Sequence, residues 1–588
     1  MTETIHVSVA WPYANGDLHV GHLAGAYLPA DIFARYNRLK GNRVLMVSGS
    51  DSHGTPIMVT ADAQGKTPRE VFEHYHARFL QTQKDIGISY DLFTHTDTEN
   101  HHRIAQDFFT ALREAEALYL ETQKLLYDEQ AERYLPDRLV EGQCPVCGYE
   151  QARGDQCDNH GGLLDALELI NPRSKLTGSP PVVRESEHYF LDLPAFTEQL
   201  KVYIANKDHW RANVINFTRN YLDQGLQGRP ITRDIEWGIP VPLDGWEGKA
   251  LYVWFEAVMG YFTASVEWAH NTGQPDAWKD WWYEPSAKIY NFIGKDNIPF
   301  HTLIWQAELL GVGRIYEDDP SRQLNLPYDV PANEFMNIEG EAFSKSRNWA
   351  IWLPDILQRY DPDAIRYYVT AVMPEARDTD FSWDDFVARN NNELVAAWGN
   401  LVNRTLSLTH KHFEGQVPDP GELRPADQAL LAKVEAGIDE VGGLLGAVKL
   451  RAALDAAMSL ARETNRYLDD QAPWFQVKED KAAAATTLYT VLRVIDTLKI
   501  MLAPFLPFSA ERLHAMLGYE GQLFGDQHIQ TYQESTRDHG ALTYDGSKAT
   551  GRWAASQLAP GQKLGDIKPL FKKLDEEVAQ QEKARLGT

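Results

Sequence analysis

The feature that most constrains the fold of this 588-residue chain is a strand, a helix and a second strand at its start. Residues 5–9 alternate between apolar and smaller or polar side chains, which is typical of a β-strand. A turn at 15–17 follows, and apolar positions from 18 to 39 then recur at helical spacing. Residues 44–47 form a compact apolar run, as expected of a strand buried on both faces of a parallel sheet. This order predicts a βαβ unit and an α/β fold.

Two histidines lie where the predicted helix begins. His19 and His22 are three residues apart, so both imidazoles face one side of the first helical turn. We expect unpaired backbone N–H groups and the positive end of the helix dipole there, which suit phosphate oxygens. Gly21 leaves room for a flat ring or a ribose to lie against the backbone. Two such histidines are as often ordinary surface or core residues, so the pair alone leaves both interpretations open.

Polar residues follow two predicted strands. Ligands gather at the carboxyl ends of strands in open parallel sheets, so Asp51 is expected near the first helix, although it could also cap a helix ahead of Pro56. Residues 289–293 predict another apolar strand, which ends at Gly294 and Asp296. Glycine lets a nucleotide approach the backbone, and a carboxylate can accept hydrogen bonds from ribose hydroxyls.

The composition indicates a folded protein outside the membrane. Apolar residues make up 43% of the chain, and neither a run of about 20 apolar residues nor a signal-peptide pattern is present. We therefore expect a cytoplasmic protein. The net charge of −26 counts against a nucleic-acid partner, but a local basic or aromatic surface can still bind RNA.

The chain has three cysteines, all between positions 144 and 157. They are too few for a disulfide framework and their crowding indicates a metal site. Two ligand pairs, each separated by two residues and joined by nine, fit a tetrahedral structural zinc site, with cysteines buried without metal as the alternative. The proposed zinc ligands are Cys144, Cys147, Cys157 and His160.

Together these segments resemble a known enzyme family. Residues 10–22 resemble the HIGH signature of class I aminoacyl-tRNA synthetases in the form used by methionyl-tRNA synthetases, and residues 48–56 resemble the family's Gly-x-Asp-x-His-Gly segment. Residues 337–347 resemble the KMSKS loop, with Ala342 in place of the first lysine and Phe343 in place of methionine. The chain is therefore identified as a member of the methionyl-tRNA synthetase family.

The resemblance implies roles for individual residues. His19, His22 and Lys345 would be catalytic by stabilising charge on the phosphates, and Asp51 would hold the ammonium group of the amino acid. The implied methionine pocket is rich in aromatic rings, which meet thioether sulfur favourably by about 0.3 to 1.5 kcal/mol per contact. The implied ATP-binding residues are His19, Gly21, His22, Gly294, Asp296 and Lys345, and the methionine-binding residues are Trp11, Tyr13, Asp51, Trp254, Ala257, Tyr261, Phe300 and His301.

Beyond about residue 388 the pattern changes to long amphipathic helices, which predict an antiparallel bundle. Asn400 and Arg404 share a helix face, and Trp474 lies near a helix start. These side chains suit the reading of unstacked bases, although each could be an ordinary bundle residue. The resemblance implies that they contact the tRNA anticodon.

The expected fold is a Rossmann-like parallel-sheet catalytic domain with a zinc-binding insertion, followed by a helical anticodon-binding bundle. Residues 68–118 are predicted to be helical, the sheet is expected to resume at 231–242, and a last helix is expected at 570–586. The predicted boundaries are 1–117 and 226–330 for the catalytic halves, 118–225 for the insertion, 331–388 for the KMSKS-loop region, 389–548 for the bundle and 549–588 for a polar tail.

The predicted activity is ligation of L-methionine to tRNA(Met) with ATP as its Mg²⁺ complex, by a monomer with one structural Zn²⁺ and no membrane partner. Two alternatives stay open. One is another class I synthetase, and the other is a paralogue that binds tRNA without activating an amino acid, which only Ala342 favours.

Overall fold

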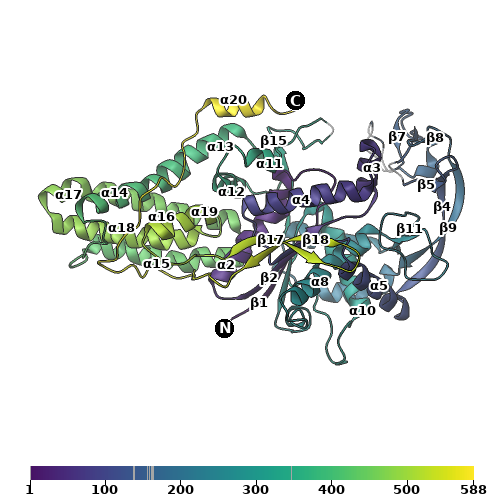
Figure 1. The fold of residues 1–588 in the computed structure, drawn as a ribbon, viewed down its shortest axis with the longest axis horizontal. Helices are drawn as coiled ribbons and strands as arrows, with labels where there is room; N and C mark the ends of the chain where they lie inside the picture. Colours follow the sequence, from purple (N-terminus) through teal and green to yellow (C-terminus); the bar gives the residue numbers. More distant parts are fainter. Residues whose placement is uncertain (1, 137–138, 155–156, 158, 160–163, 346) are drawn as a thin grey trace.

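The structure is a computed structural model that describes residues 2–136, 139–154, 157, 159, 164–345 and 347–588. Its centre is a seven-stranded sheet in the order β14-β13-β1-β2-β3-β18-β17 (Figure 1). The first five strands in this order are parallel, and β18 and β17 continue the sheet antiparallel. The strands are β1 Thr4–Val9, β2 Arg43–Ser50, β3 Leu92–His95, β13 Lys288–Gly294, β14 Ala332–Asn333, β17 Asp526–Gln533 and β18 Asp538–Asp545.

The predicted βαβ unit is confirmed. Between β1 and β2 lie α1 (Val20–His22), a π-helical turn (Leu23–Tyr27) and α2 (Leu28–Leu39). Adjacent residues of each strand face opposite cores, because side chains alternate along a strand. Met46 packs with α2, whereas Leu45 and Val47 pack against the opposite helical layer. That layer contains α5 (Glu99–Glu114), α8 (Val253–Asn271) and α10 (Trp305–Val312).

Two expectations about the sheet were wrong. The range 68–118 is not all helical, because the short strand β3 lies between α4 (Pro68–Ile86) and α5. The sheet does not resume at 231–242, where β11 (Thr232–Arg233) instead pairs with β12 (Ala250–Leu251) in a separate two-stranded sheet. Pro240 and Pro242 lack the N–H group that a central strand would donate.

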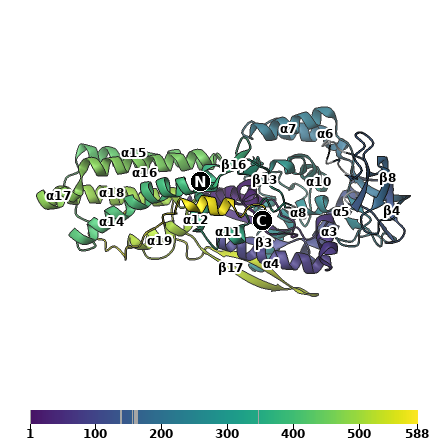
Figure 2. The same ribbon diagram turned by 90° about the horizontal axis from the view of Figure 1, so that it is seen from above.

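An insertion lies at one end of the molecule, on the right of Figure 1. A long antiparallel pair, β4 (Leu118–Asp128) and β9 (Val182–Leu191), forms its base. Figure 2 shows α6 (Thr197–Ile204) and α7 (Ala212–Gln224) lying together above the rest of the chain in that view. A small three-stranded sheet carries the cysteines, and consists of β6 Val140–Gln143, β7 Ala152–Arg153 and β8 Ile170–Ser174.

The helical bundle lies at the opposite end and shares one continuous core with the N-terminal part of the chain. The hairpin β17–β18 falls within the range expected for the bundle, but its strands extend the central sheet. The last helix, α20 (Glu577–Lys583), is shorter than the expected 570–586. The bundle helices are α14 Asn400–His412, α15 Pro425–Gly446, α16 Leu450–Gln471, α17 Pro473–Glu479, α18 Lys481–Leu502 and α19 Pro507–Met516.

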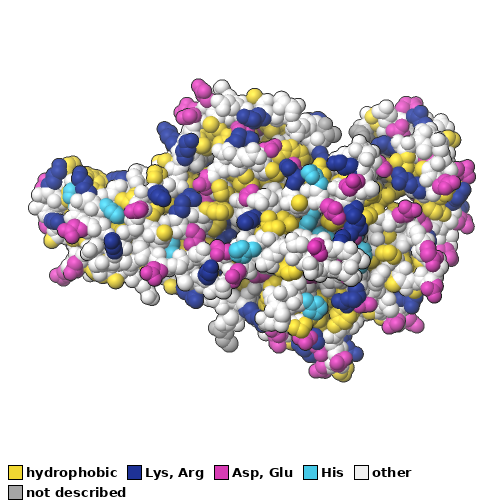
Figure 3. All heavy atoms as spheres, in the orientation of Figure 1, with side chains coloured by type: hydrophobic (Ala, Val, Ile, Leu, Met, Phe, Trp, Pro, Cys, Tyr) yellow, Lys and Arg dark blue, Asp and Glu magenta, His cyan; other side chains and the backbone are white. Residues whose placement is uncertain are grey.

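The net charge of the chain is −26, yet one face of the molecule carries both signs of charge (Figure 3). Figure 3 shows basic and acidic side chains interspersed over the face drawn. Within the described part of the chain, no helix has both the length and the apolar composition needed to cross a membrane.

Candidate active site

The candidate site lies at the carboxyl ends of the neighbouring parallel strands β13, β1 and β2. Trp11 follows β1, Asp51 follows β2, and Asp296 follows β13. The backbone joins two of these segments directly, because the N–H of Ala14 donates to the carbonyl of Asp51 at 3.0 Å. The sheet thus brings together residues that are nearly 300 positions apart, as expected for a ligand site in an open parallel sheet.

His19 and His22 use their own rings to cap the start of α1. The N–H of Gly21 donates to His19 Nδ1 at 3.1 Å, and the N–H of His19 donates to His22 Nδ1 at 3.3 Å. The expectation of unpaired N–H groups in this turn was therefore wrong, because the side chains and the carbonyl of Ile351 satisfy them. Since each Nδ1 accepts, the ring proton is assigned to Nε2, which remains a donor.

Both imidazoles are held neutral. Burial, then the neighbouring Lys345, lowers the pKa of His22 to about 4. Burial, then His22 and Lys345, holds the pKa of His19 well below its usual value. At neutral pH the pair therefore offers two uncharged N–H donors on rings whose centroids are 3.8 Å apart.

The loop that resembles KMSKS lies directly over this turn. The Phe343 ring stacks on His19 with centroids 3.9 Å apart. Lys345 is exposed as a residue, but its Nζ donates to the Asn15 carbonyl at 2.6 Å and lies against Gly16. Partial desolvation lowers the pKa of Lys345, against the attraction of Asp17. The loop cation and the two histidines therefore share one region.

Gly294 and Asp296 lie next to each other at the end of β13. A Cβ at Gly294 would be 2.8 Å from Asp296 Oδ1, so glycine lets this carboxylate fold back over the strand end. Burial raises the pKa of Asp296. Gly294 also pairs with Asn333 of β14, whose side chain donates to the Ala24 carbonyl at 2.7 Å.

The predicted methionine-pocket rings lie together. Trp254 stacks on Phe300 with centroids 4.5 Å apart, and Tyr13 meets the same indole edge-on at 5.8 Å. The Tyr261 hydroxyl donates to His301 Nε2 at 2.7 Å, because His301 Nδ1 donates to the Asn297 carbonyl. Burial lowers the pKa of His301 to about 4, so the ring is neutral.

Trp11 completes this aromatic group from the end of β1. Its ring centroid lies 6.5 Å from that of Tyr261. The indole fits between β2 and α8 only because both backbones are glycine there: an added Cβ would lie 2.3 Å from the ring at Gly49 and 2.7 Å at Gly260. Ala257 is buried on α8, one turn after the helix begins.

Asp51 is 2% exposed and does not cap a helix, since α3 (Thr55–Gln64) begins after Gly54. Its Oδ1 accepts the backbone N–H of His53 at 3.2 Å. Burial, then the charge of Glu256, raises the pKa of Asp51 well above its usual value. The carboxylate therefore lies in a place where a cationic ligand group would be stabilised.

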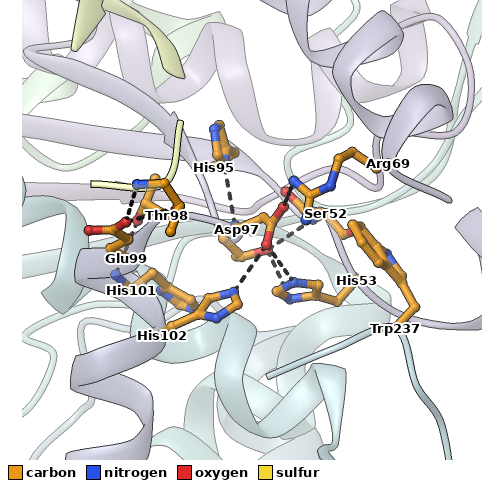
Figure 4. Close-up of polar contacts among 12 residues, drawn as sticks. Ser52, His53, Arg69, His95, Asp97, Thr98, Glu99, His101, His102 and Trp237 are labelled. Atoms are coloured by element: carbon orange, nitrogen blue, oxygen red, sulfur yellow. Dashed lines mark hydrogen bonds and ion pairs between the residues drawn. The ribbon is translucent and has the colours of Figure 1, made fainter. Parts of the chain in front are cut away.

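A buried polar network beneath this carboxylate was missed in the sequence. Figure 4 shows His53, His102 and Arg69 converging on Asp97, which follows β3. His53 Nδ1 lies 2.8 Å from Glu256 Oε1 on its other side. Burial lowers the pKa of His53, but the carboxylates of Glu256 and Asp97 outweigh this effect and raise the pKa to about 10. The sequence signal that could have revealed Asp97 is its place just after β3, because ligand-site residues often follow strands, but β3 was not predicted.

Two groups of described residues have ligand atoms close enough to share a metal ion. His53, Asp97 and His102 fit a cation poorly, because His53 is protonated and two guanidinium groups already pair with Asp97. The other group is the cysteines.

Cys144, Cys147 and Cys157 suit a metal. The Cys147 and Cys157 sulfurs lie 3.5 Å apart, and the Val146 N–H donates to Cys144 Sγ at 3.4 Å. Hydrogen bonds from Asn159 and the backbone lower the pKa of Cys147 to about 6, which favours the thiolate that metals bind. His160, the fourth predicted ligand, lies outside the described residues.

The three predicted anticodon residues belong to α14 and α17, two helices that lie at the end of the bundle away from the sheet (Figure 1). Asn400 is exposed and Arg404 is half-buried on α14, and Trp474 is the second residue of α17. The Arg404 guanidinium lies 4.8 Å from the Trp474 ring centroid and pairs with Asp469 at 2.8 Å. A flat cation and an indole thus lie side by side on this end.

Comparison with known proteins gives the family. Residues 5–406 match the description "tRNA synthetases class I (M)", and residues 417–544 match "Anticodon binding domain of methionyl tRNA ligase". A curated methionine–tRNA ligase from Thermomicrobium roseum is 57% identical over 588 residues, covering 100% of this chain and 99% of that protein. The chain belongs to the methionine–tRNA ligase family. A second member, from Roseiflexus castenholzii, is 54% identical and covers 100% of this chain and 99% of that protein.

Solved structures agree with this methionine–tRNA ligase assignment. The Mycobacterium tuberculosis methionyl-tRNA synthetase in complex with methionyl-adenylate superposes with a TM-score of 0.75 and 26% identity, covering 97% of this chain and 100% of that one. The chain is thus an enzyme of the methionine–tRNA ligase family, which forms an aminoacyl-tRNA bond. The predicted fold class is confirmed.

Proposed function

We propose that the chain joins L-methionine to tRNA(Met) in two steps at the carboxyl ends of β13, β1 and β2. The methionine carboxylate attacks the α-phosphate of ATP and releases pyrophosphate. The terminal ribose hydroxyl of the tRNA then attacks the carbonyl carbon of the methionyl-adenylate, which forms the ester bond and releases AMP. The observation that supports this most is the meeting of three phosphate-compatible donors, from His19, His22 and Lys345, on the same strand ends that carry the group of aromatic rings.

The three donors would act by electrostatic stabilisation. Neutral His19 and His22 would each donate Nε2–H to a phosphate oxygen, which needs no change of protonation state during the reaction. Lys345 would exchange its bond to the Asn15 carbonyl for the phosphates. The enzyme forms no covalent intermediate in this scheme, so catalysis depends on alignment and charge. Gly21, Gly294 and Asp296 would receive the adenosine.

Methionine would be held at both ends. Its ammonium group would pair with Asp51, whose buried carboxylate lies beside the negative charge of Glu256. Its thioether would lie among the rings of Trp11, Tyr13, Trp254, Tyr261, Phe300 and His301, with Ala257 at the wall. The contacts with aromatic rings suit a polarizable sulfur.

The tRNA anticodon would bind at the far end of the bundle. Asn400 would hydrogen-bond base edges, while Trp474 and Arg404 would stack on unpaired bases. Loss of Arg404 would therefore weaken tRNA charging and leave amino-acid activation intact.

The metal at the cysteines would be one structural Zn²⁺, held by Cys144, Cys147, Cys157 and His160. Their sulfur and nitrogen atoms match the ligands that zinc prefers, and four protein ligands would leave no open position. ATP would enter as its Mg²⁺ complex, with the ion bound mainly by phosphate oxygens. We propose a monomer that works in the cytoplasm, where closely spaced thiols stay reduced.

The decisive test is pyrophosphate exchange into ATP. We expect methionine, and no other amino acid, to drive the exchange. Lys345→Ala should slow it by about 100-fold, as loss of one stabilising donor does, with methionine binding by equilibrium dialysis unchanged. Normal exchange in this variant would contradict the role of Lys345. Ala342→Lys, which restores the family's first lysine, should lower the KM for ATP.

A further inference from the structure

The turn of the C-terminal hairpin lies against the buried network beneath the candidate amino-acid site. β18 pairs with β3 through Leu542 and Phe93, so the hairpin turn is carried to the carboxyl end of that strand. The Ser535 and Thr536 hydroxyls donate to the Glu99 carboxylate, which fixes the turn on the start of α5. The turn therefore lies against Glu99, the first residue of α5, which is two residues after Asp97 and follows the N-cap Thr98.

Arg537 contacts Asp97 twice from this turn. Its Nη2 donates to the Asp97 backbone carbonyl and lies 2.5 Å from Asp97 Oδ2. Arg69 of α4 donates to the same carboxylate oxygen at 2.7 Å. The Asp97 side chain is 4% exposed, so two guanidinium groups hold one buried carboxylate from opposite ends of the sequence.

The other carboxylate oxygen faces the amino-acid site. Asp97 Oδ1 lies 3.2 Å from His102 Nε2 and 3.7 Å from His53 Nε2. The His53 ring contacts Glu256 on its far side at 2.8 Å, and its backbone N–H donates to Asp51. Arg537, Asp97, His53 and Asp51 therefore form an unbroken series of contacts.

We propose that Arg537 is a positioning residue for the amino-acid site: by fixing Asp97 it sets the orientation of His53 and thereby of Asp51. Among the described residues, Arg69 is then the charged group that remains in contact with Asp97 Oδ2 when Arg537 is lost. The carboxylate can then rotate toward Arg69 and draw away from His53. This inference rests on the proposed role of Asp51 in holding the ammonium group.

The consequence is a link between two parts of the chain. Arg537 belongs to the segment that matches the anticodon-binding description, whereas Asp97 and Asp51 belong to the segment that matches the class I synthetase description. The hairpin therefore contributes to methionine selection as well as to the sheet edge.

The test compares Arg537→Ala with Arg537→Lys and with Lys548→Ala, which removes a charge from an exposed residue just after β18. Pyrophosphate exchange is measured with methionine varied and with ATP varied. We expect Arg537→Ala to raise the KM for methionine about tenfold, while the KM for ATP changes by less than about twofold. Lysine keeps the positive charge but not the planar guanidinium group, so Arg537→Lys should recover part of the methionine affinity. Lys548→Ala should match the parent protein.

Equal changes in both KM values, or an unchanged KM for methionine in a folded variant, would overturn the inference. If Arg537→Ala does not fold, the inference is tested by whether Arg537→Lys raises the KM for methionine more than the KM for ATP. A double-mutant cycle with Asp97→Asn should give non-additive effects on methionine binding. Asp51→Asn separates the two proposals: normal methionine binding in that variant refutes the role of Asp51, whereas loss there with no effect of Arg537→Ala refutes only the role of Arg537.

Discussion

Each histidine at the start of α1 accepts a backbone N–H at Nδ1, and this determines which proton it can offer. The same contact that begins the helix leaves Nε2–H as the donor of His19 and of His22. A protonated ring could not accept at Nδ1, so the cap and the neutral state support each other. Local helix chemistry and phosphate recognition therefore depend on the same two atoms.

A substitution at Gly16 can test how closely Lys345 must lie against residues 10–22. A Cβ at Gly16 would be 2.3 Å from Lys345 Nζ, so Gly16→Ala should displace the ammonium group without disturbing the fold. We expect pyrophosphate exchange to slow by about 10- to 100-fold, because misplacement by about 1 Å weakens transition-state contacts. Gly443→Ala is the matched control, since a Cβ there meets nothing within 4 Å. Equal rates in the two variants would exclude this packing role.

His76 predicts a dependence of stability on pH. The Ser50 hydroxyl donates to Nδ1, and Nε2–H donates to the Gly540 carbonyl of β18. Burial lowers the pKa of His76 to about 4 in the folded state. The unfolded state binds the proton near pH 6.5, so stability is present at pH 7 and is lost as the pH falls from about 6.5 to about 4.

The expected loss from His76 between pH 7 and pH 5 is about 2 kcal/mol of unfolding free energy. His76→Gln cannot take up the proton, so its thermal midpoint should fall less over this interval than that of the parent protein. Protonation of the other buried histidines should lower the thermal midpoints of the parent protein and of His76→Gln equally, so the difference between the two proteins reports His76. An equal fall in the two proteins would show that His76 does not titrate in this range.

At the scale of elements, the periodicity of apolar residues predicted the long amphipathic helices but not the short or polar strands. In the region predicted to be a bundle, apolar residues recur at helical spacing over 431–448 and 488–502. The first series lies in α15 up to Leu445, whereas Val448 follows the helix, and the second series lies in α18. Strand β3 has only four residues, too few for a pattern to emerge. β17 consists mainly of polar residues because it is an edge strand. It pairs with β18, which joins the central sheet through β3, more than 400 residues away in the sequence.

The residues of the candidate site likewise fall into two groups, those that the sequence revealed and those that it did not. Its motif residues follow strands or begin helices, so spacing and resemblance located them in the sequence. The network of Asp97, Glu256 and Arg537 could not be predicted, because its members come from separate elements that meet only after the sheet and hairpin assemble. A charged residue in a sequence carries no sign of a buried partner in another element.

The cysteine-bearing sheet predicts a local response to metal removal. If one zinc ion holds β6, β7 and β8 together, a chelator should release about one equivalent per chain. The insertion should then be cut by protease at least about tenfold faster, because metal binding supplies most of the stability of so small a sheet. The β4–β9 pair should persist, since its ladder runs from Leu118 to Tyr127 without the cysteines.

Metal content and the map of cleavage sites measure this response, and Cys144→Ser should reproduce it without chelator. Cleavage spread evenly over the whole chain would contradict a local role for the metal. A parent protein with no zinc after purification in metal-containing buffer would contradict the assignment of the ligands.

At the scale of the molecule, a buried arginine joins the sheet to the bundle. Arg366 of α12 (Pro362–Ala371) is fully buried and lies 2.6 Å from Asp31 of α2. The same guanidinium donates to the Phe505 carbonyl at 2.9 Å, after α18, and to the Gly87 carbonyl at 3.2 Å, after α4. One side chain thus satisfies acceptors from both parts.

Loss of Arg366 should weaken the whole molecule and not one part. Arg366→Ala leaves Asp31 with Arg35 as its remaining ion pair and leaves several buried carbonyls unsatisfied, so we expect a cost of about 3 to 5 kcal/mol. Thermal unfolding followed at the sheet and at the bundle should show both midpoints falling together. Arg462→Ala removes an exposed pair with Asp455 and should cost less than about 1 kcal/mol. Loss of stability in only one part of Arg366→Ala would show that Arg366 does not couple the two parts, which would then depend on their shared apolar core and on the hairpin contact at Arg537.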